Sequence, residues 1–488
     1  MKISLWEHQE EALEWLENRD FGALFMLPRS GKTAVAIHKM RRIYQKHGQI
    51  LPTLILCPAL VIDNWKREIE MHSGAEVIRN IVVLKGEVKK RAKEMILTPR
   101  NIFITNYEAL DNSTFVLAVK KRGIRVLIPD ESHRVRKHNG VRALALQGIA
   151  DKAQYKIPLT GLPKPNTYLD TWGSLRLLGG GIVPENYYTF KNQFFEDKNL
   201  RIKLAKKRKE AWAMNVPYYP RWEIKAGKEK ELKELIASCS FSVEKERLKL
   251  PPIVKQVYKV GLAPEQEKHY KQLLRDFLTI YDEGGRCVTQ SVLTQALRLQ
   301  QICSGTLPLT TEGRNVDIPT NKLSALKEII EDIDGKFIIW SHWRESHKQI
   351  AELLDTLNIS FVSITGATPQ KERDGLIQAF SNDPSVRCYL GNQSAGGIGI
   401  NLSVAQHMIY YSKSDSYEHD MQSEARFEHQ LSPFKTLFRI DLVTEGTIEE
   451  DIQENLCRKG KEGEALIRFI ARARSVLGKD SEAIPLAA

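Results

Sequence analysis

The sequence predicts an α/β fold in which two doubly wound parallel sheets follow each other along the chain. Three observations predict it. The chain has 488 residues, which is more than one hydrophobic core usually serves. Its short apolar segments alternate with helical patterns in two separate series. These segments are rich in Ile, Leu and Val with little polar alternation, which is typical of strands buried on both faces of a parallel sheet.

The first series extends from residue 22 to residue 160. Its expected strands are Gly22–Met26, Thr53–Cys57, Asn80–Leu84, Asn101–Thr105, Arg125–Pro129 and Lys156–Thr160. Helical patterns lie between them, as at Thr33–Gln45 and Val61–Glu70. Strands that alternate with helices in this way form βαβ units, so this part of the chain is predicted to be one α/β lobe.

The second series begins near Asn321 and predicts another α/β lobe of similar size. Its expected strands are Lys336–Ser341, Ser360–Thr365, Val386–Gly391, His407–Tyr411 and Leu437–Val443. The helical patterns between them include Arg344–Leu357 and Gln370–Phe380. The expected domains are therefore residues 1–178 for the first lobe, 179–320 for helical insertions and a linker, 321–459 for the second lobe, and 460–488 for a C-terminal helix and tail.

The charge of the chain favours a polyanionic partner. Lys and Arg number 72 against 60 Asp and Glu, which gives a net charge of +12. A nucleic acid would suit this excess, although a charge of this size also serves solubility alone. The basic run Arg201–Lys209 leaves two interpretations open, which are a contact with DNA and the solvated face of a helix.

Composition also excludes several classes of protein. The six cysteines are scattered singly without a CxxC pair, which argues against a zinc site and a disulfide framework. A reducing cytoplasm is the expected location. No apolar run reaches the roughly 18 residues that a membrane span needs, so no membrane contact is expected.

A phosphate-binding loop is predicted after the first strand. Ser30-Gly31-Lys32-Thr33 stands between an apolar strand and a helical pattern. Gly31 allows a tight turn whose N–H groups face a phosphate, Lys32 supplies charge, and Thr33 offers a hydroxyl to magnesium. The strict P-loop pattern also asks for a glycine where Met26 stands.

Acidic residues follow the strand Arg125–Pro129. Asp130 and Glu131 would lie at the carboxyl end of a parallel strand, over the crevice where ligands bind in such sheets. Asp130 can hold magnesium through water, and Glu131 can polarise an attacking water. His133 follows them and is expected to couple this site to a later motif.

These two motifs, in this order and at this separation, resemble helicase superfamily 2 and, within it, the SNF2-like branch of DNA translocases. The resemblance covers nearly the whole chain and implies two RecA-like lobes with the nucleotide in the cleft between them. Further segments resemble the family's motifs in the family's order: Leu5–Gln9, Cys57–Leu60 with Asn64 and Trp65, Thr105–Glu108, Leu159–Pro163, Leu250–Pro252, Ile364–Gly366 with Arg373, Ser394–Leu402 and Gln422–Gln430.

The resemblance implies ATP and Mg²⁺ as cofactors and assigns roles to residues. Catalysis would involve Lys32, Asp130, Glu131, Arg426 and His429. The nucleotide would contact Gln9, Ser30, Gly31, Lys32, Thr33, Gly397 and Arg426, with magnesium at Thr33 and Asp130. Double-stranded DNA would be gripped by backbone near Pro58, Tyr107, Gly366 and Gly397, with branched or single-stranded DNA as further partners.

The sequence departs from the family pattern in the arginine-finger segment. Arg426 matches the first finger, but His429 stands where a second arginine is expected. Histidine is mostly neutral near pH 7 and lacks the fork of arginine. Three functions therefore stay open: a translocase on duplex DNA that remodels protein–DNA or branched structures, a strand-separating DNA or RNA helicase, and a non-catalytic DNA clamp with a weakened ATPase. A bacterial or phage-infected cell is the expected setting.

Overall fold

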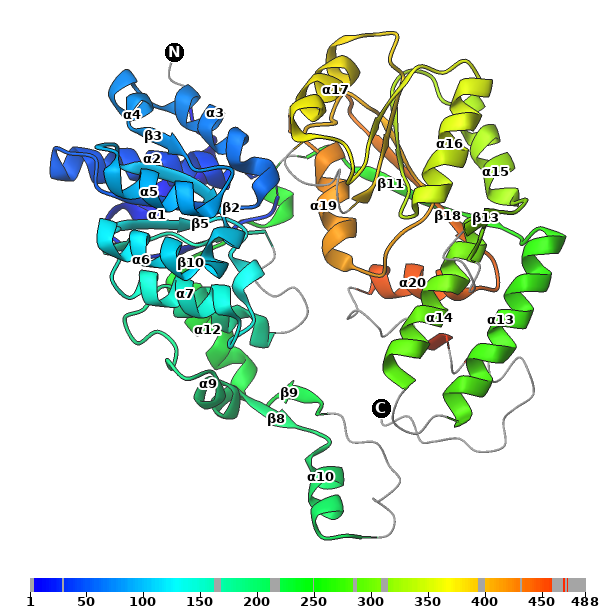
Figure 1. Cartoon of the computed structure of the whole chain (residues 1–488), viewed down its shortest axis with the longest axis horizontal. Helices are drawn as coiled ribbons and strands as arrows, with labels where there is room; N and C mark the ends of the chain where they lie inside the picture. Colours follow the sequence, from blue (N-terminus) through cyan, green and yellow to red (C-terminus); the bar gives the residue numbers. More distant parts are fainter. Residues whose placement is uncertain are drawn as a thin grey trace. The chain divides into compact units, whose positions relative to one another are not determined.

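A computed structural model of the chain describes residues 4–28, 30–161, 168–210, 220–248, 250–283, 288–308, 315–393, 400–430, 432–458, 468–469 and 472. The chain divides into two compact units, Met1–Lys249 and Leu250–Ala488. Figure 1 shows their helices and strands in the colours of the sequence. Among the described residues, no helix is long and apolar enough to cross a membrane.

The central sheet of the first unit is parallel and has five strands in the order β3-β4-β2-β5-β6. In that order their bounds are Ile81–Val83, Ile102–Asn106, Thr53–Cys57, Val126–Pro129 and Tyr155–Lys156. Neighbouring residues of a strand face opposite sides of the sheet. Leu54 and Ile55 of β2 are both fully buried, so both faces are covered.

A second parallel sheet in this unit has the order β10-β1-β7, with bounds Ser240–Phe241, Ala23–Phe25 and Leu159–Thr160. Single bridges join it to the first sheet, between Phe21 and Lys156 and between Asp130 and Leu159. Strand β1 thus lies beside Leu159 and Thr160, the first residues of Leu159–Pro163, which the family resemblance makes the hinge motif that couples the ATP state to lobe closure.

The predicted strand Lys156–Thr160 is wrong as a single element. It is divided into β6 and β7, which pair with different strands. Pro158 lies between them and has no N–H to donate to a ladder. Its carbonyl accepts from Leu24 N at 2.8 Å, while Ile157 N donates to Leu127 O at 3.0 Å. The segment therefore passes from one neighbouring strand to the other at the proline.

Helices surround these sheets. In the first unit they are α1 Glu7–Glu17, α2 Lys32–His47, α3 Ile62–His72, α4 Ala75–Arg79, α5 Val88–Leu97, α6 Ser113–Arg122, α7 Val141–Ala150, α8 Thr171–Arg176, α9 Tyr187–Phe194, α10 Leu200–Lys207 and α12 Lys228–Cys239. Short 3-10 turns are η1 Ala59–Val61, η2 Tyr107–Asp111, η3 Ser132–Val135, η4 Tyr168–Asp170 and η5 Lys245–Leu248. An antiparallel pair, β8 Phe195–Asp197 and β9 Trp222–Ile224, flanks α10 in the sequence.

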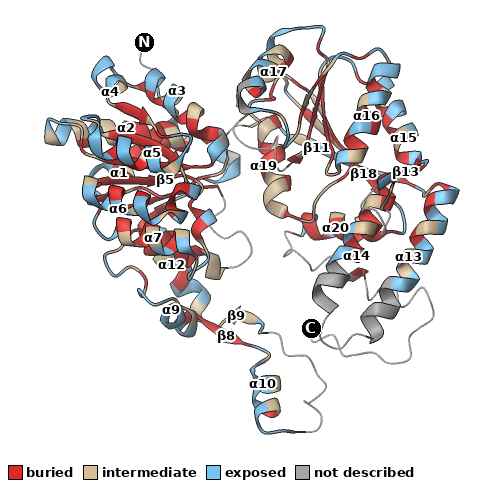
Figure 2. Cartoon of the chain, viewed as in Figure 1, coloured by how far each residue is buried: buried red, intermediate tan, exposed pale blue. Residues whose placement is uncertain are grey.

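The second unit contains a parallel sheet of six strands in the order β11-β18-β17-β14-β16-β15. In that order their bounds are Ile253–Val260, Leu437–Thr444, His407–Tyr410, Phe337–Trp340, Cys388–Gly391 and Phe361–Ile364. Ile338 and Ile339 of β14 belong to two different apolar clusters, so this sheet is also covered on both faces. Figure 2 shows the inner strands buried and the outer helix surfaces exposed.

The helices of the second unit are α13 Pro264–Glu283, α14 Val288–Cys303, α15 Asn321–Glu331, α16 Arg344–Thr356, α17 Gln370–Asn382, α19 Tyr417–Phe427 and α20 Ile448–Cys457. A hairpin of β12 Thr306–Pro308 and β13 Asn315–Asp317 follows α14. The predicted fold class, two doubly wound parallel-sheet lobes with helical insertions, is confirmed.

The predicted middle segment, residues 179–320, belongs partly to each unit, because the division falls between residues 249 and 250. It also supplies strands that the sequence pattern did not predict, among them β10 and β11, which join the parallel sheets. Most of the predicted C-terminal helix, Gly460–Leu477, lies outside the described residues. Arg472 is described, and its guanidinium donates to Thr447 O at 2.7 Å.

Candidate nucleotide and nucleic-acid sites

The predicted phosphate loop connects β1 to α2. Gly31 precedes the helix with φ +76°, in the left-handed region that favours glycine. A Cβ at this position would lie 1.9 Å from Gln9 Nε2. The backbone conformation therefore favours glycine here, and a Cβ would also displace the Gln9 amide. Arg29 lies outside the described residues.

The N-terminal helix α1 packs its first turn against this loop. Gln9 Oε1 accepts from Trp6 N at 2.9 Å, and Gln9 Nε2 donates to Ser30 O at 3.1 Å. His8 Nε2 also lies 2.9 Å from Ser30 O. The segment around Gln9, which is predicted to contact the nucleotide, is thus attached directly to the loop predicted to hold the phosphates.

Lys32 directs its ammonium back into the loop. Its Nζ donates to Met26 O at 3.0 Å and to Leu27 O at 3.3 Å. Ser30 Oγ donates to the same Leu27 O at 2.7 Å. Lys32 and Thr33 are the first residues of α2, where the helix dipole favours an anion. A buried cation and a helix N-terminus therefore coincide at the loop.

Asp130 lies at the end of β5 and is almost completely buried. Its Oδ2 accepts from Trp65 Nε1 at 2.8 Å, and its Oδ1 accepts from Glu131 N at 2.9 Å. Burial and the adjacent Glu131 carboxylate raise the pKa of Asp130 to about 6, while the Lys32 ammonium opposes the rise. The two predicted catalytic segments, phosphate loop and acidic strand end, thus lie within electrostatic reach of each other.

Glu131 connects the acidic strand end to the predicted hinge motif. Its φ is +51°, in a region that non-glycine residues rarely adopt. Its Oε2 lies 3.3 Å from His133 Nδ1, which is 2.9 Å from Thr160 Oγ1. A Cβ added to Gly161 would lie 2.8 Å from Pro28 Cδ. A path of contacts therefore runs from the Glu131 carboxylate through His133 and Thr160 to Gly161 and the phosphate loop.

The oxygen groups at this site suit magnesium. Mg²⁺ is usually held by one or two carboxylates together with substrate phosphates and water. Asp130 supplies a buried carboxylate, and Thr33 supplies a hydroxyl. Among the described residues, no group of three or more His, Cys, Asp and Glu could hold a metal ion by itself. The donors fit a cation that is shared with a nucleotide.

The two nucleic-acid segments predicted in the first unit follow strands β2 and β4. Pro58 is buried and precedes η1. Tyr107 is 1% exposed, and its hydroxyl donates to Asp130 O at 2.7 Å. Its ring therefore supports the acidic strand end, and the predicted contact of this segment with DNA stays a prediction about its backbone.

In the second unit, Gly366 lies in an exposed turn after β15. Arg373 stabilises this turn, because Nε donates to Thr368 O at 3.0 Å and one Nη donates to Thr365 O at 2.9 Å. The buried arginine thus fixes the backbone around an exposed glycine. Gly397 lies outside the described residues.

The predicted finger residues lie at the end of α19. Arg426 is half-buried in the last turn, and its carbonyl accepts from Leu402 N at 3.0 Å. The helix ends at Phe427, so His429 lies beyond it, and its carbonyl accepts from Ser432 N at 3.0 Å. Arg426 and His429 therefore do not share a helix face.

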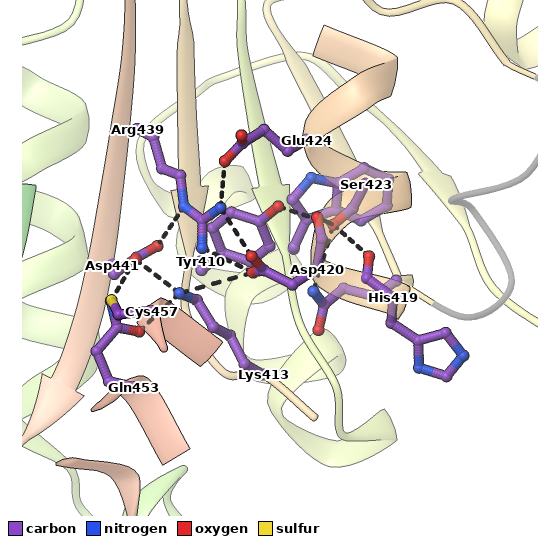
Figure 3. A network of polar contacts seen from close by, with 12 residues as sticks. Tyr410, Lys413, His419, Asp420, Ser423, Glu424, Arg439, Asp441, Gln453 and Cys457 are labelled. Atoms are coloured by element: carbon purple, nitrogen blue, oxygen red, sulfur yellow. Dashed lines mark hydrogen bonds and ion pairs between the residues drawn. The ribbon is translucent and has the colours of Figure 1, made fainter. Parts of the chain in front are cut away.

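A buried polar network under α19 was not predicted from the sequence (Figure 3). It joins the finger helix to β18, to the residues after β17 and to α20, through Lys413, Asp420, Glu424, Arg439, Asp441 and Gln453. One signal was available: Arg439 and Asp441 alternate within an otherwise largely apolar strand, which places both on one face.

A glycine-lysine-threonine loop at a helix N-terminus, an acidic pair at a nearby strand end and a second parallel-sheet unit define a two-lobed P-loop nucleotide-binding protein. The chain belongs to the SNF2-related family. The model of the SNF2-related domain matches residues 8–306, and that of the helicase conserved C-terminal domain matches residues 321–428.

Several curated proteins are similar over nearly the whole chain. An uncharacterized ATP-dependent helicase of Mycoplasma genitalium is 25% identical over 92% of this chain and 41% of its own length. A probable chromatin-remodeling complex ATPase chain of Oryza sativa is 24% identical over 94% of this chain and 40% of its own length. The chain thus spans about two fifths of the length of these relatives.

A solved structure is also similar. The SWI2/SNF2 ATPase core of Sulfolobus solfataricus in complex with dsDNA has 22% sequence identity and a TM-score of 0.43, covering 99% of this chain and 96% of that chain.

Proposed function

We propose that this chain is an ATP-driven translocase on double-stranded DNA that remodels protein–DNA or branched DNA structures. The observation that carries the proposal is the path of contacts from Glu131 through His133 and Thr160 to the phosphate loop. Such a path suits a motor, in which the state of the nucleotide must reach the segments that hold the track. Membership of the SNF2-related family and the ATP-dependent relatives support it.

In the proposed cycle, the first unit binds ATP. The backbone at Gly31, the Lys32 ammonium and the N-terminus of α2 receive the phosphates, and Gln9 contacts the base. Thr33 and Asp130 would hold Mg²⁺, which neutralises charge on the phosphate oxygens when bound. Glu131 orients the attacking water.

Arg426 supplies positive charge to the γ-phosphate during its transfer. His429 follows three residues later, where the family motif has a second arginine. A guanidinium stabilises the charge of the transferring group, and a missing finger slows hydrolysis by orders of magnitude. A neutral imidazole at position 429 replaces this effect poorly. Turnover by this chain is therefore expected to rest mainly on Arg426.

DNA is held through its phosphates by backbone near Pro58, Tyr107, Gly366 and Gly397. Phosphate contacts carry no sequence code, so binding should be weakly sequence-specific and strongly salt-dependent. Loss of the γ-phosphate removes the charge that favours the ATP-bound state. The DNA contacts of the two lobes then bind and release in turn, which moves the chain along the duplex.

The test is ATPase activity with and without double-stranded DNA, single-stranded DNA and RNA. Stimulation by double-stranded DNA supports the proposal, and no stimulation by any of them contradicts it. A forked substrate with a labelled strand separates translocation from strand separation, because the proposed motor releases little single strand. RNA-specific stimulation would favour the helicase alternative.

His429 is the observation that favours a second candidate, a DNA clamp that does not depend on turnover. Lys32→Ala and Glu131→Gln distinguish the two. If wild-type ATP consumption is at background and both variants still bind DNA and retain the biological function, the clamp is correct. If wild-type turnover is stimulated by DNA and both variants lose it, the motor is correct.

A further inference from the structure

The helical segment of the first unit that follows residue 179 contains a short helix, α10, that buries very few of its side chains. Helix α10 follows strand β8, whose antiparallel partner is β9 (Figure 1). Of the eight residues of α10, only Ala205 is buried, and Leu200 and Leu204 are 45% and 43% exposed. The helix therefore buries little apolar surface, although an isolated helix of this length has only marginal stability in water.

The charged side chains of α10 are all basic. Its eight residues include Arg201, Lys203, Lys206 and Lys207 and no acidic residue, and Arg208 and Lys209 follow directly. Lys203 lies three and four positions before Lys206 and Lys207, which are the spacings at which like charges repel on a helix surface. A polyanion along this helix would offset the repulsion.

A second charged helix of the same insertion behaves differently. Helix α12 carries three lysines and three glutamates among its first seven residues. They form ion pairs, Lys228 with Glu231, Lys230 with Glu234 and Lys233 with Glu229. The balanced charges of α12 are those expected of a helix face that contacts only solvent. The charges of α10 are all positive, which a solvated face alone does not explain.

The base of α10 is well packed, so the helix is presented from an ordered support. Asp197 Oδ1 accepts from Asn199 N at 3.0 Å and from Arg221 N at 2.9 Å. Lys191 Nζ lies 3.5 Å from the centroid of the Trp222 ring, a cation–π contact across β9. Contacts of the β8–β9 pair thus anchor the chain just before α10 and again at Arg221.

We propose that α10 with Arg208 and Lys209 is a second contact surface for the phosphates of duplex DNA, separate from the backbone grips described above. The proposal rests on the proposed function, which makes DNA the polyanion. Residues 201–207 of the helix, at about 1.5 Å per residue, extend roughly 9 Å, which spans two or three phosphates of one strand along the duplex axis.

The test replaces Lys203, Lys206 and Lys207 by Gln together. A matched control replaces Lys228, Lys230 and Lys233 of α12 by Gln. Affinity for a duplex fragment is measured at several salt concentrations, and a thermal melt confirms that each variant folds. The slope of log affinity against log salt is negative. We expect it to become shallower by about 2.7 in the α10 variant, because each phosphate neutralised by a lysine contributes about 0.9 to its magnitude. The control should keep the wild-type slope.

If the α10 variant keeps the DNA affinity and the salt slope of the wild type, the proposal is wrong. That conclusion holds even if the variant has lost binding to an acidic protein, which would then be the partner of α10. An equal loss in the α12 control also overturns it, since net charge alone would then explain the effect. Failure of the proposed function is distinguishable, because in that case wild-type ATPase is not stimulated by DNA at all.

A different observation carries a second inference, which concerns Arg439 of β18. Its Nη2 and Nη1 donate to the two carboxylate oxygens of Asp420 at 2.7 and 3.0 Å, and its Nε donates to Asp441 Oδ1 at 3.0 Å. It also donates to Glu424. Lys413 Nζ donates to Asp441 Oδ2 at 2.6 Å on the other side (Figure 3).

This arrangement fixes the orientation of the finger helix. Asp420 and Glu424 lie four residues apart on one face of α19, and Arg426 follows in its last turn. A two-oxygen contact from a planar guanidinium restricts rotation as well as distance. A second attachment, Tyr410 Oη to Ser423 Oγ at 2.7 Å, lies on the same helix.

We infer that Arg439 is a positioning residue for Arg426, which again rests on the proposed function. The test is Arg439→Lys, which keeps the charge and loses the fork. Lys322→Gln is the control, because Lys322 is 1% exposed in the same unit, pairs with Glu449 at 2.6 Å and donates to Tyr411 O away from α19. Steady-state kinetics and melting are measured for both.

We expect Arg439→Lys to lower the DNA-stimulated kcat at least about tenfold with the KM for ATP nearly unchanged, because only the finger is displaced. The control should lower the melting temperature without this kcat loss. If kcat falls equally in both variants, or if KM rises in proportion, the role of Arg439 is structural and the inference is wrong. Failure of the motor itself would appear as wild-type kcat without DNA stimulation.

Discussion

Trp65 of α3 donates its indole N–H to Asp130 at 2.8 Å and is itself 1% exposed. A residue that the family resemblance places in a nucleic-acid motif thus holds the carboxylate expected to serve magnesium. The contact joins the segment after β2, which is proposed to contact DNA, to the acidic end of β5.

Trp65→Phe should weaken this unit. It removes a donor from a buried carboxylate, and hydrogen bonds to charged groups contribute about 1.5–3 kcal/mol. We expect a loss of that size in the free energy of unfolding, measured with urea, and a lower DNA-stimulated ATPase rate. Trp172→Phe is the control, because its Nε1 donates to a neutral carbonyl, Pro184 O, at 3.0 Å. Equal losses of stability and rate in both variants would contradict the special role of Trp65.

Gly31→Ala should abolish tight nucleotide binding. Alanine meets two obstacles, φ +76° and a Cβ position 1.9 Å from Gln9 Nε2. Gly48→Ala, at the other end of the same helix, meets only the first, since φ is +64° and nothing lies within 4 Å. Both should lose about 1–2 kcal/mol from the left-handed backbone. Only Gly31→Ala should lose affinity for a fluorescent ATP analogue, and normal affinity there would disprove the loop assignment.

Thr160→Val should uncouple hydrolysis from DNA. It removes the hydroxyl that lies 2.9 Å from His133 Nδ1 while preserving the shape of a fully buried side chain. The ratio of ATPase rates with and without duplex DNA should fall severalfold, with nucleotide affinity nearly retained. Thr53→Val removes a buried hydroxyl that contacts Leu51 O at 2.8 Å and should leave the ratio intact. An intact ratio in Thr160→Val would show that the path is not used.

His429→Arg should accelerate turnover. It restores a permanent cation where the finger motif expects one, and finger residues change kcat by large factors. We expect a rise in DNA-stimulated kcat of at least about tenfold. His429→Gln separates charge from size and should remain near the wild-type rate. A rate for His429→Arg at or below wild type would show that position 429 is not part of the finger.

Acid should destabilise the second unit through His347. This side chain is 7% exposed, its Nε2 lies 2.9 Å from Ser363 Oγ, and burial lowers its pKa to about 4. Between that pH and the unfolded value of about 6.5, the unfolded chain binds more protons, so stability falls as pH falls through this range. The contribution is up to about 3 kcal/mol. Urea unfolding at several pH values should show a shallower decline in His347→Gln, and parallel curves would refute this assignment.

The fold was predictable wherever a local pattern was strong. Strand β2 was predicted with its observed bounds, Thr53–Cys57, because five consecutive buried residues leave a clear signal. Strand β10 has two residues, and its place beside β1 is decided by distant partners. Strand β11 is an edge strand that is mostly exposed, so apolar periodicity was weak.

The site was predictable only where chemistry is local in the sequence. Gly31 and Lys32 are adjacent to each other and to a helix start, so their arrangement follows from the chain itself. The donation from Trp65 to Asp130 joins residues 65 positions apart. The burial of Tyr107 and the network around Arg439 also depend on side chains from several strands, which a single segment does not reveal.

The close approach of Pro28 and Gly161, where an added Cβ would lie 2.8 Å away, has a mechanical consequence. Two rigid surfaces in van der Waals contact transmit displacement without any change in charge. If the phosphate loop widens around a nucleotide on this side, it pushes the backbone of Gly161, directly after β7. The hinge segment would therefore respond partly to the volume of the bound nucleotide. A bulkier residue at position 161 would hold the backbone there in the displaced position even without nucleotide.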